Sequence, residues 1–240
     1  MLDITLIPIL KDNYVFFAKD NVTGMSAIID PGEAKPVIDF LDSRGEKLDL
    51  ILNTHHHGDH IGGNKALIEK YGCEVIGPES ETHRIKTITK PVMDGDTIKI
   101  GSQSGTVIEV PGHTIGHIVY YFAESNALFV GDTLFAMGCG RLFEGTPAQM
   151  WHSLNKLKKL PLKTKVYCAH EYTQHNGNFC LTIEPNNQDL IDRMNEVKNM
   201  RAQNIPTVPT KIGLEVETNA LFRAETVEEF AEIREKRDNW

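Results

Sequence analysis

The sequence contains no long hydrophobic run. Its wholly apolar stretches, such as Val15 to Ala18 and Ala127 to Val130, are only a few residues long. A membrane-spanning helix needs about 20 apolar residues. The first ten residues, MLDITLIPIL, include Asp3 and no basic segment, so they are typical of a first β-strand rather than of a secretory signal. We therefore expect a cytoplasmic protein that has no membrane partner.

Positive charge is in deficit. The chain has 25 Lys and Arg residues against 33 Asp and Glu residues, which gives a formal net charge of -8. A chain with this balance repels the phosphates of nucleic acids, so we expect no nucleic-acid partner. If the ligand is an anion, a local group of positive side chains must hold it.

Cysteine is scarce and dispersed. The four cysteines form no CxxC pair, which excludes a dense disulfide framework and a cysteine zinc site and predicts reduced, mostly buried thiols. The composition, 40% hydrophobic and 24% charged, also excludes a disordered or low-complexity chain, and no repeat of fixed period is present. The cysteines are Cys73, Cys139, Cys168 and Cys180.

Short β-type runs alternate with helical patterns over most of the chain. Two β-rich stretches, each followed by helices and strands, predict an α+β fold in which two sheets pack together with helices outside. Beyond about Tyr172, polar turn material (NGN, EPNNQ) alternates with helical patterns, so we expect one domain over residues 1–172 and a small helical domain over 173–240. The predicted strands are 4–9, 14–18, 26–29, 48–52, 74–76, 97–100, 106–110, 117–122, 127–130 and 165–168, and the predicted helices are 35–44, 63–71, 147–160, 189–202 and 227–236.

Histidines gather in the segment THHHGDH, residues 54–60, which holds four of the ten histidines and follows a predicted strand. Side chains alternate along an extended segment, so His55 and His57 point together, and a turn at Gly58 lets Asp59 and His60 face a neighbouring point. Imidazole suits Zn, Fe, Ni and Cu, and a carboxylate can bridge two cations, so the cluster predicts a two-metal site. Further ligands stand where other β runs stop, namely His113 in PGHT, Asp132 in GDT and His170 in AHEY.

A single histidine after a strand is more often a capping or core residue than a ligand. We apply that interpretation to His56, expected to orient or support its loop, and to His117, expected to form a hydrogen bond within its own loop. Cys168 shares the strand parity of His170 but is expected to be a core thiol. The convergence of four loops, each with a His or Asp at the end of a β run, favours the metal site. The isolated histidines His83, His152 and His175 are interpreted as surface residues.

The segments THHHGDH, PGHT, GDTLF, GCGRLFEG and AHEYT, in this order and spacing, resemble the metallo-β-lactamase superfamily and, within it, the glyoxalase II (hydroxyacylglutathione hydrolase) family. The resemblance covers the whole chain, including the C-terminal REKRD. It implies a four-layer αββα sandwich with a binuclear site at one edge. It also implies that the C-terminal helical domain helps to bind glutathione.

The resemblance assigns the metal ligands residue by residue. Two carboxylates only partly offset two divalent charges, so a bridging water should be acidic near neutral pH. Asp59 and Asp132 are the expected catalytic carboxylates. Zinc is the first expectation for the two divalent metals, with iron or manganese as alternatives, because His and Asp accept all three. The implied ligands are His55, His57 and His113 for the first metal, Asp59, His60 and His170 for the second, and Asp132 as the bridge.

The activity implied is hydrolysis of S-(2-hydroxyacyl)glutathione, above all S-D-lactoylglutathione to glutathione and D-lactate, by a metal-bridging hydroxide. A thiolate leaves with a conjugate-acid pKa near ~8.5, so no strong general acid is required. Phe143 stands where one branch of the family has Tyr, and it cannot donate a hydrogen bond. A monomer is expected. The implied glutathione contacts are Arg141, Phe143, Tyr172, Arg234 and Arg237.

Other interpretations remain open at this point. The basic residues near the C-terminus would favour the dipole of a helix capped at Thr226 without any ligand. A nuclease on this fold should carry a basic channel, which the net charge disfavours. A persulfide dioxygenase would hold one iron and lack the REKRD tail, and a lactonase remains possible. A flavodiiron protein would have Glu where His57 stands, and a metal-binding protein without catalysis is the last alternative.

Overall fold

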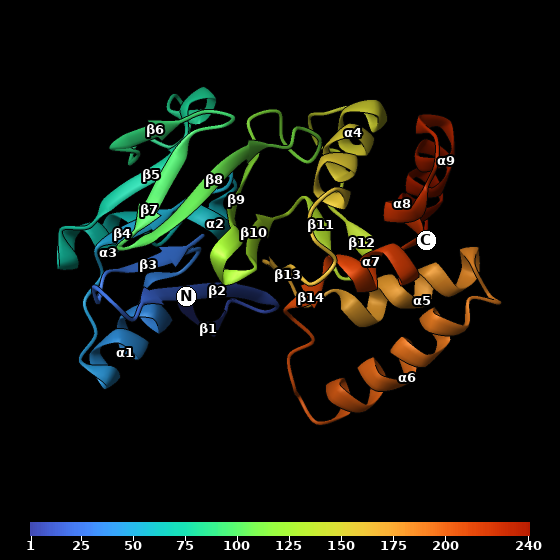
Figure 1. The fold of residues 1–240 in the computed structure, drawn as a ribbon, viewed down its shortest axis with the longest axis horizontal. Helices are drawn as coiled ribbons and strands as arrows, with labels where there is room; N and C mark the ends of the chain where they lie inside the picture. Colours follow the sequence, from blue (N-terminus) through green and yellow to red (C-terminus); the bar gives the residue numbers. More distant parts are fainter. The chain divides into compact units, whose positions relative to one another are not determined.

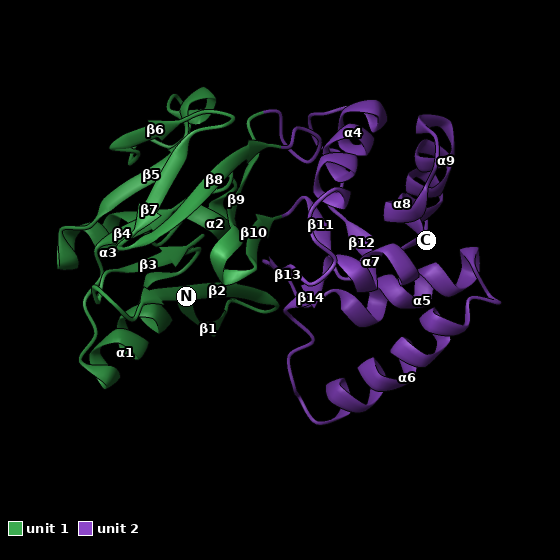
Figure 2. Ribbon diagram, viewed as in Figure 1, with its two compact units in different colours: residues 1–109, 116–131 green, residues 110–115, 132–240 purple.

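The computed structural model describes residues 1–240, and the chain divides into two compact units (Figure 2). Unit 1 comprises Met1–Glu109 and Gly116–Gly131, and unit 2 comprises Val110–Ile115 and Asp132–Trp240. The predicted domain boundary between residues 172 and 173 lies inside unit 2, and it stays a prediction. None of the helices is long and apolar enough to cross a membrane.

Unit 1 contains a six-stranded sheet that begins antiparallel and ends parallel (Figure 1). Strands buried on both faces are expected to be continuously hydrophobic, and every residue of Ser26–Ile29 and Leu50–Leu52 is buried. In spatial order the strands are β1 (Leu2–Ile9), β2 (Asn13–Asp20), β3 (Ser26–Ile29), β4 (Leu50–Leu52), β5 (Glu74–Pro78) and β6 (Lys90–Val92).

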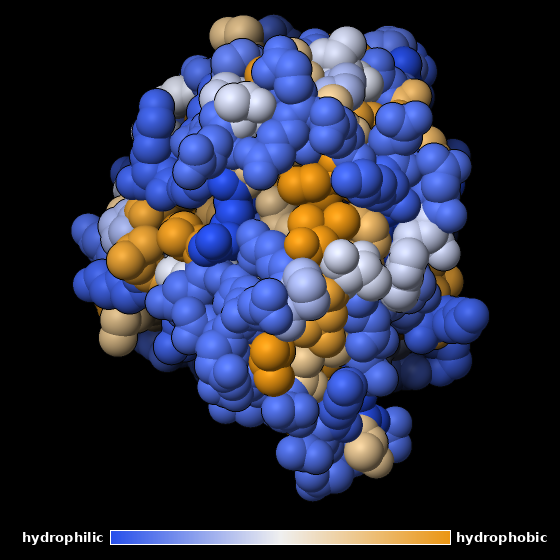
Figure 3. All heavy atoms as spheres, turned by 90° about the vertical axis from the view of Figure 1, so that its right-hand side faces the viewer, coloured by the Kyte–Doolittle hydropathy of each residue, from blue (hydrophilic) through white to orange (hydrophobic).

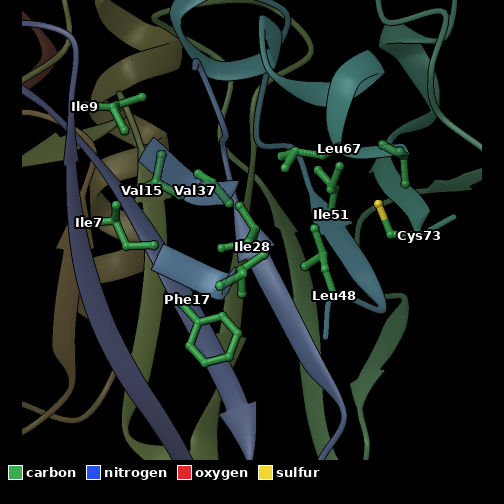
Figure 4. Packing of buried hydrophobic residues seen from close by; sticks show 12 residues of the cluster. Ile7, Ile9, Val15, Phe17, Ile28, Val37, Leu48, Ile51, Leu67 and Cys73 are labelled. Atoms are coloured by element: carbon green, nitrogen blue, oxygen red, sulfur yellow. The ribbon is translucent and has the colours of Figure 1, made fainter. Parts of the chain in front are cut away.

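Two helices cover one face of this sheet, α1 (Ala34–Arg44) and α3 (Asn64–Tyr71). Figure 4 shows their Val37 and Leu67 in one cluster with strand residues such as Val15 and Ile51. Burying an aliphatic side chain of this size stabilises the fold by about 1.5–3 kcal/mol. The helical spacing of apolar residues in these segments therefore places those residues on the face of each helix that packs on the sheet.

The other face of the sheet packs on an antiparallel meander of unit 1. Side chains alternate along β2, so Phe16 points away from its neighbours Val15 and Phe17, and its ring lies 6.0 Å from that of Phe129. The hydroxyl of Tyr120 donates to the carbonyl of Asn53 at 2.7 Å, joining the meander to the end of β4. The meander strands are β7 (Thr97–Ile100), β8 (Gln103–Glu109), β9 (Ile118–Phe122) and β10 (Ala127–Gly131).

Unit 2 is mainly helical (Figure 1). Thr146 and Gln149 form a capping box at the start of α4, where Pro147 is the first residue, and Thr226 accepts from Glu229 N at the start of α9. On the face of the molecule at the right of Figure 1, apolar groups are set among hydrophilic ones (Figure 3). The helices are α4 (Pro147–Lys158), α5 (Thr173–Ile183), α6 (Gln188–Ala202), α7 (Ile212–Thr218), α8 (Ala220–Arg223) and α9 (Val227–Asp238), and the short strands are β11 (Leu134–Phe135), β12 (Gly138–Cys139), β13 (Lys165–Cys168) and β14 (Thr210–Lys211).

The structure corrects one local prediction in unit 2, because the NGN segment, expected as a turn, lies inside α5. A Cβ on Gly177 would come within 2.0 Å of the Met194 sulfur of α6, so the absence of a side chain lets α5 approach α6 closely. Tertiary packing outweighs the weak helix propensity of Asn and Gly here. The core between these helices includes Cys180, Leu190, Met194 and Val197.

A buried carboxylate, that of Glu215, joins α7 to three other parts of unit 2. Glu215 Oε1 accepts from Arg193 Nη2 at 2.7 Å and from Thr210 Oγ1, and Oε2 accepts from Met137 N at 2.7 Å. Asn219 Nδ2 donates to the same Oε2 at 2.9 Å. Four donors thus satisfy one carboxylate, which ties α6 and α7 to the turn of the β11–β12 hairpin.

Candidate metal and substrate site

The four predicted ligands of unit 1 follow β4 in one loop and the first turn of α2 (Gly58–Ile61). His55 Nε2 lies 3.1 Å from His57 Nδ1, and the rings of His55 and His60 are 4.1 Å apart. Zinc–nitrogen bonds of about 2.0–2.1 Å place two nitrogens of one tetrahedral zinc roughly 3.3 Å apart. The spacing of the two imidazoles therefore fits a shared cation.

Asp30 orients two of these imidazoles. Its Oδ2 lies 3.1 Å from His60 Nδ1 and accepts from Thr54 Oγ1 at 2.6 Å. Because the Thr54 hydroxyl donates to Asp30, its oxygen accepts from His55 Nδ1, which is 3.0 Å away. Both rings therefore carry their proton on Nδ1 and keep an Nε2 lone pair for a metal.

Asp30 and Asn13 are functional residues that the sequence interpretation missed. Asn13 Nδ2 donates to Asp59 Oδ2 at 2.9 Å and so fixes that carboxylate. Asp30 has a φ of 52°, an uncommon value outside glycine that is typical of functional sites. A signal for Asp30 was present, because it ends a β run just as Asp132 does, whereas nothing marked Asn13.

His56 and His117 support the loop in different ways. His56 Nδ1 lies 3.2 Å from Glu81 Oε2, and Arg84 Nη1 is within 3.2 Å of both ring nitrogens. These contacts are in keeping with the supporting role predicted for His56. The His117 ring stacks on that of His55 at 4.6 Å and 19°, so it restrains the face of a predicted ligand.

Three predicted ligands lie in unit 2, and two of them, His113 and His170, lie close to one oxygen of the third, Asp132. His113 Nε2 and His170 Nε2 lie 3.4 Å and 3.3 Å from the same Asp132 Oδ2. His113 Nδ1 is 2.8 Å from the carbonyl of Arg141, which can only accept, so the ring proton is on Nδ1. The Nε2 lone pair then faces a carboxylate oxygen, an arrangement that a cation bound by both would stabilise. This donor set of two imidazoles and one carboxylate fits a divalent cation.

Unit 2 also forms a cavity of about 290 Å³ that is open to solvent. It contains all five residues predicted to contact glutathione, together with the two predicted metal ligands His113 and Asp132. The other lining residues are Phe135, Cys139, Asn176 and Asp238.

Three guanidinium groups give the cavity its positive charge. Arg234 is 6% exposed, donates from Nη1 to the Cys139 carbonyl at 3.1 Å and from Nη2 to Asp238 Oδ1 at 2.8 Å, and its buried Nε has no hydrogen-bond partner. Arg141 Nε contacts the same Asp238 oxygen at 3.3 Å. Burial lowers the pKa of Arg237, and the charge of Arg234 lowers it further. An anionic ligand would accept hydrogen bonds from these three guanidinium groups. The dipole of helix α9 alone does not explain why they gather around one cavity.

Aromatic rings frame the two histidines of the cavity. Tyr172 stacks on His170 at 4.7 Å and 6°, and Phe135 meets both rings edge-on. Phe143 is 61% exposed, contacts the His113 ring at 5.3 Å and donates its amide to the His113 carbonyl. Tyr172 and Phe143 therefore support predicted ligands as well as lining the cavity.

The four cysteines are free and buried, as predicted. Burial raises the pKa of Cys168 to about 12, which makes it an unreactive core thiol. The three isolated histidines His83, His152 and His175 are exposed, also as predicted.

Comparison with known proteins gives consistent matches along the chain. Residues 15–170 match the family model described as metallo-beta-lactamase superfamily, and residues 171–240 match that described as hydroxyacylglutathione hydrolase C-terminus. A hydroxyacylglutathione hydrolase of Methylococcus capsulatus is 47% identical, covering 99% of this chain and 98% of the relative. One of Rhodospirillum rubrum is 48% identical over 100% and 99%. The crystal structure of ETHE1 from Myxococcus xanthus shares the fold, with a TM-score of 0.74 and 24% identity over 98% of this chain and 90% of that one.

Proposed function

Because the chain belongs to the hydroxyacylglutathione hydrolase family of the metallo-β-lactamase superfamily, we propose that it hydrolyses S-(2-hydroxyacyl)glutathione thioesters, above all S-D-lactoylglutathione, to glutathione and D-lactate. The observation that carries the proposal is the cavity of unit 2, where His113 and Asp132 lie with three arginines. Such a cavity suits a thioester whose thiol portion carries carboxylates, which the arginines would bind, and whose acyl group would lie at His113 and Asp132. The alternatives of a lactonase or a persulfide dioxygenase are not favoured, because neither accounts for the arginines or for the C-terminal match.

His/Asp clusters in the chain can hold divalent metal, and we propose two ions per chain, zinc first, with iron or manganese as alternatives. The tautomers of His55, His60 and His113 support this proposal, since each ring keeps Nε2 for a metal. When bound, the metals would supply Lewis acidity and acidify a water near neutral pH. The proposed ligands are His55, His57, Asp59, His60, His113, Asp132 and His170.

The side chains of this chain supply orientation and charge. We expect Asp59 to orient the attacking water, because the hydrogen bond from Asn13 restrains one oxygen of its carboxylate. Arg141, Arg234 and Arg237 would hold the carboxylates of the thiol half, with Tyr172 and Phe143 against its backbone. The leaving thiolate requires no proton donor, since its conjugate acid has a pKa near ~8.5.

We also propose that the chain is a monomer without a nucleic-acid partner, which its charge of -8 supports. The proposed domains are 1–172, which holds all seven ligands, and 173–240, which holds Arg234 and Arg237. Size-exclusion chromatography with light scattering tests the monomer, and a mass of twice 26.9 kDa would overturn it.

The direct test of the function is release of free thiol from S-D-lactoylglutathione by purified protein, with bound metal counted on the same sample. Rapid release with two metals per chain supports the hydrolase. No release at two metals per chain would redirect the assignment to a lactonase or another hydrolase. One iron per chain would redirect it to the dioxygenase.

The arginines of α9 give a prediction for substrate affinity. Replacing Arg234 and Arg237 together by alanine should raise KM at least tenfold and leave metal content unchanged, because a hydrogen bond to a charged group contributes about 1.5–3 kcal/mol and a tenfold change corresponds to about 1.4 kcal/mol. Steady-state kinetics with metal analysis checks this. Lys236→Ala is the matched control, since Lys236 is exposed on the same helix. A double variant with unchanged KM would rule out a binding role for both arginines.

A further inference from the structure

Arg237 is held at the edge of the cavity by residues of α5 and by Trp240. Its Nη2 donates to Asn176 Oδ1 at 3.2 Å, and Asn176 is itself buried and anchored to the Ala136 carbonyl at 3.2 Å. The guanidinium carbon lies 5.6 Å from the centre of the Phe179 ring and 5.3 Å from that of Trp240. Both distances fall within the range of about 6 Å for a cation–π contact.

Trp240 lies outside the cavity, unlike Arg237 and Asn176. Its ring contacts His175 at 4.8 Å and Phe179 at 5.9 Å, so α5 fixes its position. It is 51% exposed, which is unusual for a residue kept only for core packing. Three different groups, an amide oxygen and two aromatic faces, therefore converge on one guanidinium.

We infer that Trp240 is a positioning residue for substrate binding, which holds the Arg237 guanidinium against Phe179 and so aims it into the cavity. This inference rests on the proposed function, because it takes Arg237 to bind the thiol half of a glutathione thioester. A lysine at position 237 would present a compact, hydrated charge, whereas the planar guanidinium lies against aromatic faces and still donates to an acceptor. The Arg at this position and the exposed Trp three residues later thus act as a pair.

The kinetic test uses Trp240→Ala, Trp240→Phe and the exposed neighbour Lys236→Ala as control. Trp240→Ala should raise KM about two- to fivefold, the size expected when one cation–π contact is lost at an exposed site, with kcat and metal content unchanged. Trp240→Phe should recover most of the affinity, because it keeps an aromatic face. A loss of kcat with unchanged KM, or no rescue by Phe, would overturn the inference.

A binding experiment separates this inference from the proposed function. The chain has two tryptophans, Trp151 and Trp240, so Trp151→Phe leaves Trp240 as the only tryptophan fluorophore. Titration with S-methylglutathione, a thioether that cannot be hydrolysed, should change Trp240 emission and give its Kd. Emission that stays unchanged at saturation, as judged by calorimetry, would count against coupling between Trp240 and the cavity.

A double-mutant cycle completes the test, with calorimetry of S-methylglutathione binding as the measurement. Arg237→Ala should weaken binding, and adding Trp240→Ala to it should weaken binding no further. Both changes remove the same interaction, the contact of the positioned Arg237 guanidinium with the ligand. If Arg237→Ala binds as tightly as the unaltered chain, the proposed role of Arg237 in binding glutathione fails. If Arg237→Ala binds weakly but the two effects add, the positioning role of Trp240 fails while the proposed function stands.

Discussion

Replacing Asp132 by alanine is expected to abolish metal retention and hydrolysis together. His113 Nε2 and His170 Nε2 both face Asp132 Oδ2, at 3.4 Å and 3.3 Å. Without that carboxylate both proposed metal positions lose the negative charge that would offset the bound cations. Stabilisation of the transition state by metal amounts to several kcal/mol, so activity should fall at least about a thousandfold. Thiol release from S-D-lactoylglutathione and elemental analysis of the same sample check the result.

Two further variants define the cause of the loss at Asp132. Asp132→Asn keeps the shape of the side chain and removes its charge, and it should lose metal as well if charge is what matters. Asp189→Ala, at an exposed position in the first turn of α6, should behave like the unaltered chain. A normal metal content in Asp132→Ala would exclude Asp132 as the bridging ligand.

The largest loss of stability is expected from Glu215→Ala. The change leaves the Arg193 guanidinium, which is 8% exposed, without its carboxylate partner. Removing one member of a buried ion pair costs about 3–5 kcal/mol, because the remaining charge is not compensated. At about 2–4 °C per kcal/mol for a chain of this size, Tm should fall by roughly 10 °C. Thermal unfolding followed by circular dichroism measures the shift.

The neighbouring Glu217 supplies the control for Glu215. Glu217 is exposed on the same helix, so Glu217→Ala should change stability by no more than about 0.5 kcal/mol. Since Glu215 also holds Met137 N in the β11–β12 turn, the Glu215 variant should lose activity as well as stability. Equal stability of the two variants would show that the Glu215 network contributes little.

Much of the fold could be predicted from local patterns. The bounds of β3, β7 and β13 coincide with the predicted strands, because each is a compact β run with turn signals at its ends. The helices α1, α4, α6 and α9 follow their apolar spacing to within a few residues. Helix α5 could not be predicted, because Asn176 and Gly177 favour turns and only their contacts with other parts of unit 2 explain a helix there.

Part of the candidate site could also be predicted from the sequence, and part could not. The predicted ligands stand at the ends of β runs, where a His or Asp is visible in the sequence, and within each unit the structure brings them close together. The orientation of these ligands depends on Asp30 and Asn13, and that of Arg237 depends on Asn176. The partners of all three residues are far away along the chain. Neither spacing nor composition reports which amide or carboxylate lies beside a given ring, so these residues become visible only in the folded chain.

Hydrogen bonds between two segments of unit 2 have a thermodynamic consequence. His113 donates to the Arg141 carbonyl, the Phe143 amide donates to the His113 carbonyl, and the Gly145 amide donates to the Gly112 carbonyl. A displacement of the segment that carries the proposed metal ligand His113 therefore displaces the segment that carries the proposed substrate contacts Arg141 and Phe143. Coupling between binding sites is reciprocal, so occupancy by metal and occupancy by the thiol must change each other's affinity by the same factor.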